Sequence, residues 1–597
     1  MTDATVEAAG ERNGVAAARG ARPVGRERRK KAGDATAGRD STAGPASMDW
    51  FADAQRQLLS AIGLPDATAG TLFGVAQSLL HSVGAALTSG AAASAGKRAR
   101  RSGTDAAATA RSTSGTPASA LPDDGQLPPL EQAYIAWSVA LDDWLSNAGL
   151  DGMELARARF VARILKDVLA PHNSLVGNPA ARQRARETKG ESLRRGLRNL
   201  MDDLRHNHGY PAVANRHAFT LGVEVASTPG EVILRTELLE LIQYRPVTPQ
   251  VHAVPIVYVF SQVNRFYLGD LTADRSLFRA LLDAGITVFA VSWRNPTPAQ
   301  RNWGLDSYVD GVIRAIDAAK AITGSAQVSL VGVCAGGIAT AVAAAVLRAR
   351  GRSDVACLSQ FINVLDNRLE DSEFGLWLTE ASVAAQKREV RARGVFTEKQ
   401  VFEMFAWLRP EENVMAFLRS NYLLGEEPPS HPLLFWSMDY TRMPARLHAD
   451  HLELSLHNAL ARGELKSLGM HADLAGIDCP VYVMAGSTDH ITPWPACYRS
   501  VPLFAGQCEF VLTSQNHTQT LCAREDNRHL RYWRNPALPT DPETWFADAQ
   551  EVQGHWRTHW IAWLQSHSGA LCDAPVHAGG AGHVPLCAAP GTYVLGR

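Results

Sequence analysis

A run of apolar residues that ends in a Gly-x-Cys-x-Gly turn is the strongest constraint on the fold of this chain. Residues 328–331 are Val-Ser-Leu-Val, the turn spans residues 332–336 with Cys334 at its centre, and an alanine-rich stretch follows. Glycines on both sides of the cysteine allow a turn so tight that a Cβ atom would collide with a neighbouring strand or helix. The pattern therefore predicts a strand, a sharp turn and a helix, with the Cys334 thiol at the strained tip and directed out of the sheet.

Two further apolar runs lead into loops that contain an acid and a histidine. Residues 480–486 precede Asp489, and residues 508–513 precede His517. The chain order nucleophile, acid, histidine, with each residue in a loop after a strand, is typical of the α/β-hydrolase fold. We therefore expect Cys334, Asp489 and His517 to lie at one edge of the sheet and to form a catalytic triad.

Each of these residues also has a plainer interpretation. Cys334 could be a thiol buried at a helix start, Asp489 a carboxylate that caps the turn before Ile491, and His517 a surface histidine. The three plain interpretations together would be a coincidence, so the triad is favoured. His490 is a second candidate for the base, but its position directly after Asp489 should turn its side chain the other way, and we interpret it as structural.

The remainder of the C-terminal two thirds alternates short apolar runs with helical periods. Such alternation indicates an α/β fold with a mainly parallel sheet that is covered on both faces. A long insert at about 365–470, rich in Trp, Phe, Leu and charged residues, would lie over the Cys334 turn as a lid that excludes water. The expected strands are residues 255–260, 286–291, 327–331, 356–364, 480–485 and 508–513, and the expected helices are residues 274–284, 307–322 and 337–350.

Composition divides the chain into four parts. Residues 1–128 form a mostly disordered head rich in Ala, Gly and Arg, with a possible amphipathic helical pair at 48–88. Residues 129–225 have a helical period and should form an N-terminal helical domain. The catalytic domain is expected at 226–570, and residues 571–597 are rich in Gly and Ala and are predicted to be a flexible tail.

Several long motifs, in order along residues 133 to 565, resemble the polyhydroxyalkanoate (polyester) synthases, and one of them, SWRNPTPAQRNWGLDSY, is closer to the medium-chain-length type. The resemblance implies an acyltransferase that loads the acyl group of 3-hydroxyacyl-CoA onto Cys334 as a thioester, releases CoA and extends a polyester. It further implies a cytoplasmic enzyme at polyhydroxyalkanoate granules that contacts the growing polyester chain and the granule surface and works as a homodimer through the lid. The other motifs are RNLMDDLRHNHGYP, ELIQYRPV, QVNRFYLGDL, NYLLG, FWSMDYTRMP and GSTDHITPW.

The resemblance also assigns roles within the reaction. His517 would take the thiol proton, and Asp489 would orient the histidine or assist deprotonation of the incoming hydroxyl group. The oxyanion needs two backbone N–H donors, which would be Ala335, directly after the nucleophile, and Val263, in the loop after strand 255–260. We expect no cofactor and no metal, with the CoA thioester as substrate.

This chain departs from the family pattern in two loops near the expected site. Asn516 stands where the family usually has glycine, and asparagine is the residue other than glycine that best tolerates the positive φ angle of such a turn. In the oxyanion loop, Phe260 and Ser261 replace a usual pair of prolines. These changes put rate and substrate range in question, but they leave the triad intact.

Two other functions remain open at this stage. A cysteine-dependent acyl-CoA thioesterase or hydrolase of the same fold would release free acid, and a non-catalytic granule-associated relative would release nothing. The formal net charge of −1 gives no reason to expect nucleic acid, and no apolar stretch is long enough for a transmembrane segment. Eight singly scattered cysteines argue for reduced thiols and against a disulfide framework or a metal site.

Overall fold

The computed structural model describes residues 127–150 and 152–596. These residues all belong to one compact unit. The predicted head, including the possible helical pair at 48–88, lies outside the described residues.

The N-terminal part of the described chain is helical. Helices α4 and α5 pack through an apolar core in which Trp137 and Leu141 meet Val161 and Leu165. The helices end at His206, and turns without a helix follow up to the first strand. The helices are α4 (Pro129–Asn147), α5 (Gly152–Leu169), α6 (Pro179–Glu187) and α7 (Glu191–His206), with a short 3-10 turn η2 (Pro171–Asn173) between α5 and α6.

An eleven-stranded sheet forms the centre of the described structure, in the order β15-β14-β13-β12-β7-β6-β4-β5-β2-β1-β17. The six strands from β13 to β5 are parallel, and the strands on both sides of them are antiparallel. The strands are β1 (Gly230–Arg235), β2 (Leu239–Tyr244), β4 (Ile256–Val259), β5 (Val288–Trp293), β6 (Val328–Val333), β7 (Val355–Phe361), β12 (Val481–Gly486), β13 (Cys508–Thr513), β14 (Arg531–Arg534), β15 (Gln550–Gln553) and β17 (Cys587–Ala588).

The six strands that the sequence predicts are the six parallel strands, and this part of the prediction is confirmed. The antiparallel strands at the two sides were not predicted, because they lack a purely apolar run. Strand β2 is buried throughout yet contains Glu240 and Gln243, and β14 begins and ends with arginine. Their burial depends on partners that are distant in the sequence.

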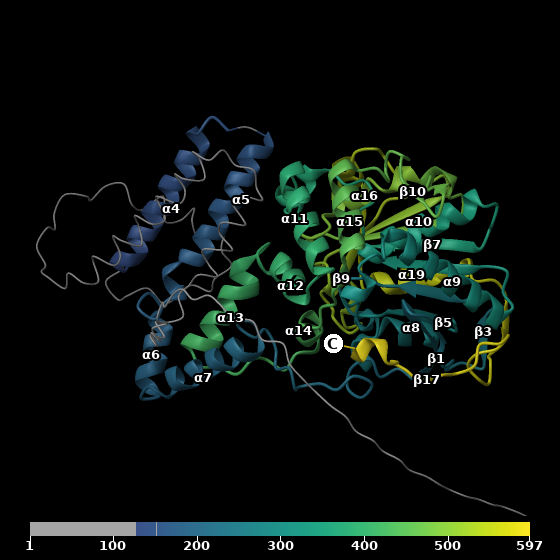
Figure 1. The fold of residues 1–597 in the computed structure, drawn as a ribbon, viewed down its shortest axis with the longest axis horizontal. Helices are drawn as coiled ribbons and strands as arrows, with labels where there is room; N and C mark the ends of the chain where they lie inside the picture. Colours follow the sequence, from purple (N-terminus) through teal and green to yellow (C-terminus); the bar gives the residue numbers. More distant parts are fainter. Residues whose placement is uncertain (1–126, 151, 597) are drawn as a thin grey trace, which may run out of the picture. The chain divides into compact units, whose positions relative to one another are not determined.

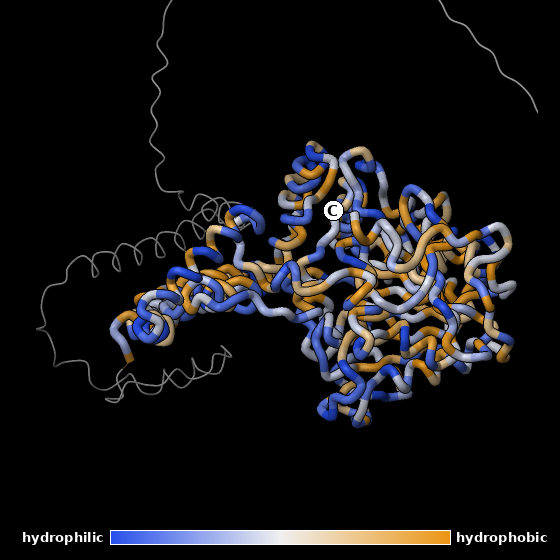
Figure 2. The backbone as a smooth tube through the Cα atoms, turned by 90° about the horizontal axis from the view of Figure 1, so that it is seen from below, coloured by the Kyte–Doolittle hydropathy of each residue, from blue (hydrophilic) through white to orange (hydrophobic). Residues whose placement is uncertain are grey.

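Helices cover both faces of the sheet, as predicted (Figure 1). The side chains of Val257 and Val259 belong to one apolar core with α9 (Leu305–Thr323) and α10 (Ala335–Ala349). Their neighbours on the same strand, Ile256 and Tyr258, belong to a second core with α8 (Leu277–Asp283) and α19 (Trp556–Ser566). Hydrophobic segments gather inside this part of the molecule and hydrophilic ones follow its outer loops (Figure 2). Alternation along each strand thus builds two cores, one on each face.

The predicted insert between β7 and β12 is mostly helical. It contains two short π-helical turns, η8 (Glu411–Met415) and η9 (Arg419–Leu423), which flank α13. Figure 1 shows α7 next to this segment, and the Asn199 side chain on α7 donates a hydrogen bond to the carbonyl oxygen of Asn421 at 3.0 Å. The N-terminal helices therefore pack on the insert. Its elements are α11 (Glu380–Arg393), β8 (Val395–Phe396), α12 (Glu398–Ala406), α13 (Ala416–Leu418), α14 (Pro432–Ser437), β9 (Met443–Pro444), α15 (Ala445–His457), β10 (Lys466–Ser467) and β11 (Met470–His471).

The C-terminal segment, predicted to be a flexible tail from residue 571, is instead ordered against the sheet. Strand β16 (Leu571–Asp573) pairs with β3 (Gln250–His252), and β17 joins the large sheet beside β1. Glycines at positive φ, including Gly591, let the segment turn between these pairings. Backbone pairing of this kind does not depend on apolar side chains, so composition alone suggested flexibility. The short helices α16 (Trp494–Tyr498), α17 (Gln519–Cys522) and α18 (Pro542–Ala547) complete the described elements near this end of the chain.

Between residues 127 and 596, position 151 aside, no helix is both long enough and apolar enough to span a membrane.

Candidate active site

Cys334 lies at the tip of the turn between β6 and α10, as predicted. Its backbone angles are φ 53° and ψ −133°, a region that residues other than glycine rarely adopt. Its N–H donates a hydrogen bond to the carbonyl oxygen of Phe361 at 3.0 Å, and its carbonyl oxygen accepts one from the N–H of Gly337 at 2.8 Å. These bonds hold the strained conformation, and the side chain is partly exposed.

The two predicted glycines are required by close packing. A Cβ on Gly332 would clash with the hydroxyl group of Thr340 and approach the Cα of Gly337 to 2.6 Å. A Cβ on Gly336 would come within 2.5 Å of the carbonyl oxygen of Val259. Neither glycine has a positive φ angle, so the constraint at both positions is steric.

Asp489 and His517 meet beside this turn. Strands β6, β7, β12 and β13 are neighbours in the parallel part of the sheet, so the loops after them converge at one edge. Nδ1 of His517 lies 2.7 Å from Oδ2 of Asp489. The Asp489 side chain has no exposed surface, and the His517 side chain is 12% exposed. The structure therefore brings together the acid and the histidine that the sequence predicts.

The charge of His517 is set by its neighbours. Burial by itself would lower the pKa of His517, but Asp489 and the adjacent Cys334 outweigh burial and raise it to about 10. Burial would likewise raise the pKa of Asp489, yet His517 and the surrounding hydrogen bonds hold it below its ordinary value. Because Nδ1 is taken by Asp489, Nε2 is the ring nitrogen left for the Cys334 sulfur. The arrangement places a buried carboxylate, a histidine with a raised pKa and a cysteine next to one another in that order.

Asp489 both pairs with His517 and caps the turn before Ile491, so both interpretations of its sequence position hold. Its Oδ1 accepts hydrogen bonds from the N–H groups of Ile491 and Thr492, at 2.8 and 2.9 Å, and so caps the turn. Its Oδ2 binds His517 and also accepts a hydrogen bond from the Thr492 hydroxyl group at 2.6 Å. One carboxylate therefore shapes the loop with one oxygen and holds the histidine with the other.

Thr492 is a site residue that sequence reasoning missed. Its Oγ1 lies 3.1 Å from Nδ1 of His517 as well as 2.6 Å from Asp489. A Thr three residues after an Asp is a common capping pattern, and that spacing was the signal available in the sequence. His490, the alternative base, does not pair with Asp489; it is partly buried, and burial followed by the nearby Arg409 lowers its pKa.

Of the two expected oxyanion donors, Ala335 belongs to the Cys334 turn itself and Val263 lies in the loop after β4. Ala335 is the first residue of α10, where a backbone N–H has no partner within the helix. The loop after β4 is also adjacent, since the Phe260 carbonyl oxygen would lie 2.6 Å from a Cβ placed on Gly336. In this structure the N–H of Val263 donates to the hydroxyl group of Ser261 at 3.3 Å. Ser261 thus occupies the donor that an oxyanion would need.

The histidine loop differs from the expectation in its backbone. Asn516 does not have a positive φ angle, so tolerance of that conformation is not why asparagine fits there. Its side-chain oxygen accepts a hydrogen bond from the N–H of Gln519 at 3.0 Å, and its carbonyl oxygen accepts one from the N–H of Thr520 at 3.1 Å. Asn516 therefore holds the turn that leads from His517 into α17, the helix whose N-cap is Thr518.

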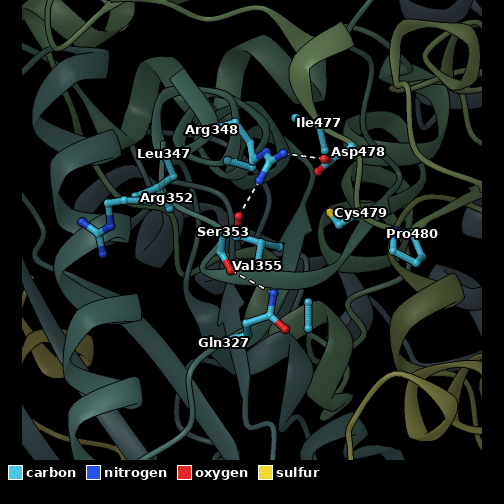
Figure 3. A pocket seen from close by; sticks show the side chains of 12 residues that line it. Gln327, Leu347, Arg348, Arg352, Ser353, Val355, Ile477, Asp478, Cys479 and Pro480 are labelled. Carbon is cyan, nitrogen blue, oxygen red and sulfur yellow. Dashed lines mark hydrogen bonds and ion pairs between the residues drawn. The ribbon is translucent and has the colours of Figure 1, made fainter. Parts of the chain in front are cut away.

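A cavity of about 300 Å³ lies at the opposite edge of the sheet (Figure 3). It is lined by residues that precede β6, β7 and β12, such as Gln327, Ser353 and Asp478, whereas the triad residues follow their strands. Arg348 forms an ion pair with Asp478 in this cavity. It is separate from the candidate active site.

The sheet order and the turn at Cys334 define a protein of the α/β-hydrolase fold with cysteine at the nucleophile position. Residues 267–517 match the family model for that fold, and residues 125–281 match the N-terminal region of poly-beta-hydroxybutyrate polymerase. Among solved structures, a monoacylglycerol lipase of Paleococcus ferrophilus is 15% identical and matches 56% of this chain and 100% of its own, with a TM-score of 0.33. A monoglyceride lipase of Saccharomyces cerevisiae is 11% identical over 59% of this chain and 99% of its own, with a TM-score of 0.34.

Relatives with higher identity identify the family. Poly(3-hydroxyalkanoate) polymerases 1 and 2 of Ectopseudomonas oleovorans are each 40% identical to this chain, over 78% of its length and 83% of theirs. The poly(3-hydroxyalkanoate) polymerase subunit PhaC of Cupriavidus necator is 35% identical, over 78% of this chain and 80% of its own. The chain belongs to the poly(3-hydroxyalkanoate) polymerase family, whose members are acyltransferases.

Proposed function

We propose that this chain polymerises 3-hydroxyacyl-CoA into polyester with release of CoA, through an acyl thioester on Cys334. The observation that carries the proposal is the position of Cys334 at a strained turn beside the hydrogen-bonded pair of His517 and Asp489, in a member of the polymerase family. His517 moves the protons, and Asp489 orients its ring and stabilises its positive charge.

In the loading step, the Cys334 thiolate attacks the carbonyl carbon of the acyl-CoA, because the thiolate is the nucleophilic form of cysteine. The bond from that carbon to the CoA sulfur breaks, and the CoA sulfur takes the proton from His517. One thioester replaces another, so the step is nearly balanced in energy and the acyl group stays activated.

In the elongation step, a hydroxyl group attacks the thioester on Cys334. The new carbon–oxygen bond forms as the bond to the Cys334 sulfur breaks, and His517 takes the hydroxyl proton. The negative charge of the Cys334 sulfur is one cause of the raised pKa of His517. An acylated sulfur has no charge, so acylation lowers the pKa of His517 and lets its ring accept the hydroxyl proton. His517 can therefore donate a proton in the first step and accept one in the second.

Backbone N–H groups stabilise the negative oxygen of each tetrahedral intermediate. Ala335 supplies one donor from the start of α10, and Val263 supplies the second from the loop after β4, once its N–H leaves Ser261. The insert at 365–470 acts as the lid and limits access of water. Exclusion of water favours polymer growth over hydrolysis of the thioester.

The proposal is tested by measuring CoA release from the purified full chain with 3-hydroxydecanoyl-CoA and with 3-hydroxybutyryl-CoA, with analysis of the products for polyester and free acid. Polyester that depends on Cys334 supports the proposal, and a higher kcat/KM for the ten-carbon substrate supports the medium-chain preference. A Cys357→Ala variant is the matched control, since Cys357 is a buried cysteine on β7 that is remote from the turn in sequence.

Three outcomes would contradict the proposal. Free hydroxy acid without polymer would identify an acyl-CoA thioesterase, and no CoA release from either substrate would identify a non-catalytic relative. Equal losses in the Cys334→Ala and Cys357→Ala variants would refute Cys334 as the nucleophile.

We further propose that the chain works as a homodimer through the lid insert and acts at the surface of the polyester granule. Both statements follow from the family resemblance. Light scattering of the purified protein with and without substrate tests the dimer, and co-sedimentation with isolated granules tests the association.

A further inference from the structure

We propose that the C-terminal segment 586–596 positions the oxyanion loop 260–265, and that Arg265 is the link between them. The proposal rests on the function proposed above, since it concerns the loop that carries Val263. It assigns a role in acyl transfer to a segment that contributes no side chain to the triad.

Arg265 is a buried cation whose partners come from two distant parts of the chain. The residue is 3% exposed, and its Nε lies 3.3 Å from Oδ1 of Asp439 in the lid insert. Its Nη1 donates to the carbonyl oxygen of Tyr593 at 3.1 Å, and its Nη2 donates to that of Gly596 at 2.6 Å. A buried guanidinium group is costly unless its N–H groups are paired. The C-terminal segment therefore supplies two of the acceptors that keep Arg265 in place.

These two carbonyl groups lie at the two ends of the short 3-10 turn η12 (Tyr593–Leu595): Tyr593 is its first residue, and Gly596 directly follows its last. The Tyr593 carbonyl oxygen also accepts the N–H of Gly596 at 3.2 Å and uses its second lone pair for Arg265, whereas the Gly596 carbonyl oxygen lies beyond the turn and has no backbone partner within it. The Arg265 guanidinium group therefore bonds to both ends of this turn.

The C-terminal segment is itself tied firmly to the sheet. Glu240 on β2 is fully buried, and its carboxylate accepts hydrogen bonds from the N–H groups of Thr592 and Tyr593, each at 2.9 Å. The Tyr593 hydroxyl group donates to the carbonyl oxygen of Thr236 at 2.6 Å, and the Val594 side chain is 2% exposed. The segment is therefore a rigid support that can hold the loop in place.

The oxyanion loop has other supports that maintain the fold when this one is removed. The Trp293 side chain donates to the carbonyl oxygen of Phe260 at 2.9 Å, and the Trp436 side chain donates to that of Arg265 at 2.9 Å. Thr441 holds the carbonyl oxygens of Gln262 and Val263. Loss of the C-terminal contact should shift the loop without unfolding the sheet.

The test compares the full chain with a chain that ends at residue 590, alone and combined with Arg265→Met. Truncation should lower kcat for CoA release about 10- to 100-fold with little change in KM, a part of what loss of one oxyanion donor costs. In a chain that already carries Arg265→Met, truncation should lower kcat further by less than about threefold, because the link between the segment and the loop is already absent. If the fold-loss in kcat of the doubly changed chain equals the product of the losses from truncation alone and Arg265→Met alone, the proposal is overturned.

A point variant replaces the truncation if the shortened chain does not fold. A Cβ on Gly591, which has φ +85°, would clash with the Glu240 carboxylate, so Gly591→Ala should lift the segment from its anchor. Gly582 has the same φ angle but no atom within 4 Å of a Cβ, so Gly582→Ala is the matched control for backbone strain. Equal kcat values for the two variants would overturn the proposal.

Two further measurements separate this proposal from the proposed function. Alkylation of Cys334 by iodoacetamide forms no oxyanion, so its rate should stay within about twofold in the truncated chain. Hydrogen exchange at the amides of 260–265 should be faster after truncation, and exchange in α10 should not change. Unchanged exchange at 260–265 would overturn the positioning role, whereas a full chain that releases no CoA would refute only the proposed function.

Discussion

The hydroxyl oxygen of Thr492 lies 2.6 Å from Oδ2 of Asp489, the same carboxylate oxygen that pairs with Nδ1 of His517. Oγ1 is also 3.1 Å from that nitrogen. Thr492 thus holds the acid from the side, and its backbone N–H binds the other carboxylate oxygen. The orientation of His517 therefore depends on a residue outside the triad.

Replacing Thr492 with valine should lower kcat for CoA release about tenfold or more with little change in KM. The change removes one hydrogen bond to a buried charged group, which is worth ~1.5–3 kcal/mol. Thr492→Ser keeps the hydroxyl group and should retain most of the activity. Steady-state kinetics of the two variants decide the point, and equal activities of Val and Ser would show that the hydroxyl group is not needed.

Iodoacetamide at pH 8 should modify Cys334 well before the buried cysteines. Burial raises the pKa of Cys357, Cys508 and Cys522 to about 12 in each case, so these thiols hold their protons at that pH. Peptide mass mapping over a time course gives the order of modification. Modification of Cys357 first would contradict the structure. Cys572 is exposed and reacts independently, so the order is determined from the peptides that contain Cys334, Cys357, Cys508 and Cys522.

The rate of the loading step should decline on the alkaline side as His517 loses its proton. Its pKa is raised to about 10, so the imidazolium is present at neutral pH and is lost as pH rises through that value. Asp489→Asn removes the negative charge that holds the proton, so the alkaline limb of the pH profile should move to lower pH. The pre-steady-state burst of CoA release, measured from pH 6 to 10.5 for both proteins, gives the alkaline limb of each pH profile. Asp526→Asn is the control, because it removes an exposed carboxylate that pairs with Arg524. The alkaline limb of its pH profile should coincide with that of the unchanged chain.

Removing the Ser261 hydroxyl group should raise kcat for CoA release by up to about fivefold. Val263 N–H must leave Ser261 before it can bind the oxyanion, and a typical hydrogen bond contributes ~1 kcal/mol net. Ser261→Ala frees the donor in advance, whereas Ser566→Ala, on the exposed surface of α19, is the control. A fall in kcat for Ser261→Ala would show that the hydroxyl group supports the loop.

Replacing Asp167 on α5 with asparagine should stabilise the protein at pH 7 to 8 and not near pH 4. Burial, followed by the nearby Glu411, raises the pKa of Asp167 to about 6, so the folded state binds more protons than the unfolded state between about 4 and 6. Stability from this group therefore falls as pH rises through that window. Thermal unfolding at several pH values measures the effect, and Asp143→Asn, at an exposed position of α4, is the control for an Asp-to-Asn change on a neighbouring helix.

A pH-independent difference between the Asp167→Asn variant and the unchanged chain would contradict the raised pKa. It would instead indicate that the asparagine changes packing between α5 and the π-helical turns of the insert.

The parallel centre of the fold and the meeting of Asp489 and His517 beside the Cys334 turn could be predicted from the sequence, because their signals are local. Short apolar runs mark buried strands, and Gly332 and Gly336 mark the tight turn around Cys334. Asp489 and His517 each follow such a run, and parallel strands bring the loops after them to one edge. Thr492 escaped notice because its hydroxyl group acquires meaning only when His517 arrives from another loop.

The sequence by itself determined which residues can do the chemistry, since the nucleophile, acid and histidine and the strands before them are encoded within short segments. Tertiary structure alone decided how those residues are supported. The C-terminal segment shows this most clearly: its composition suggests a flexible tail, yet Glu240 and Arg265 hold its backbone against the sheet and the oxyanion loop. Backbone groups are the same in every residue, so partners such as these are set by which distant segments the fold brings together.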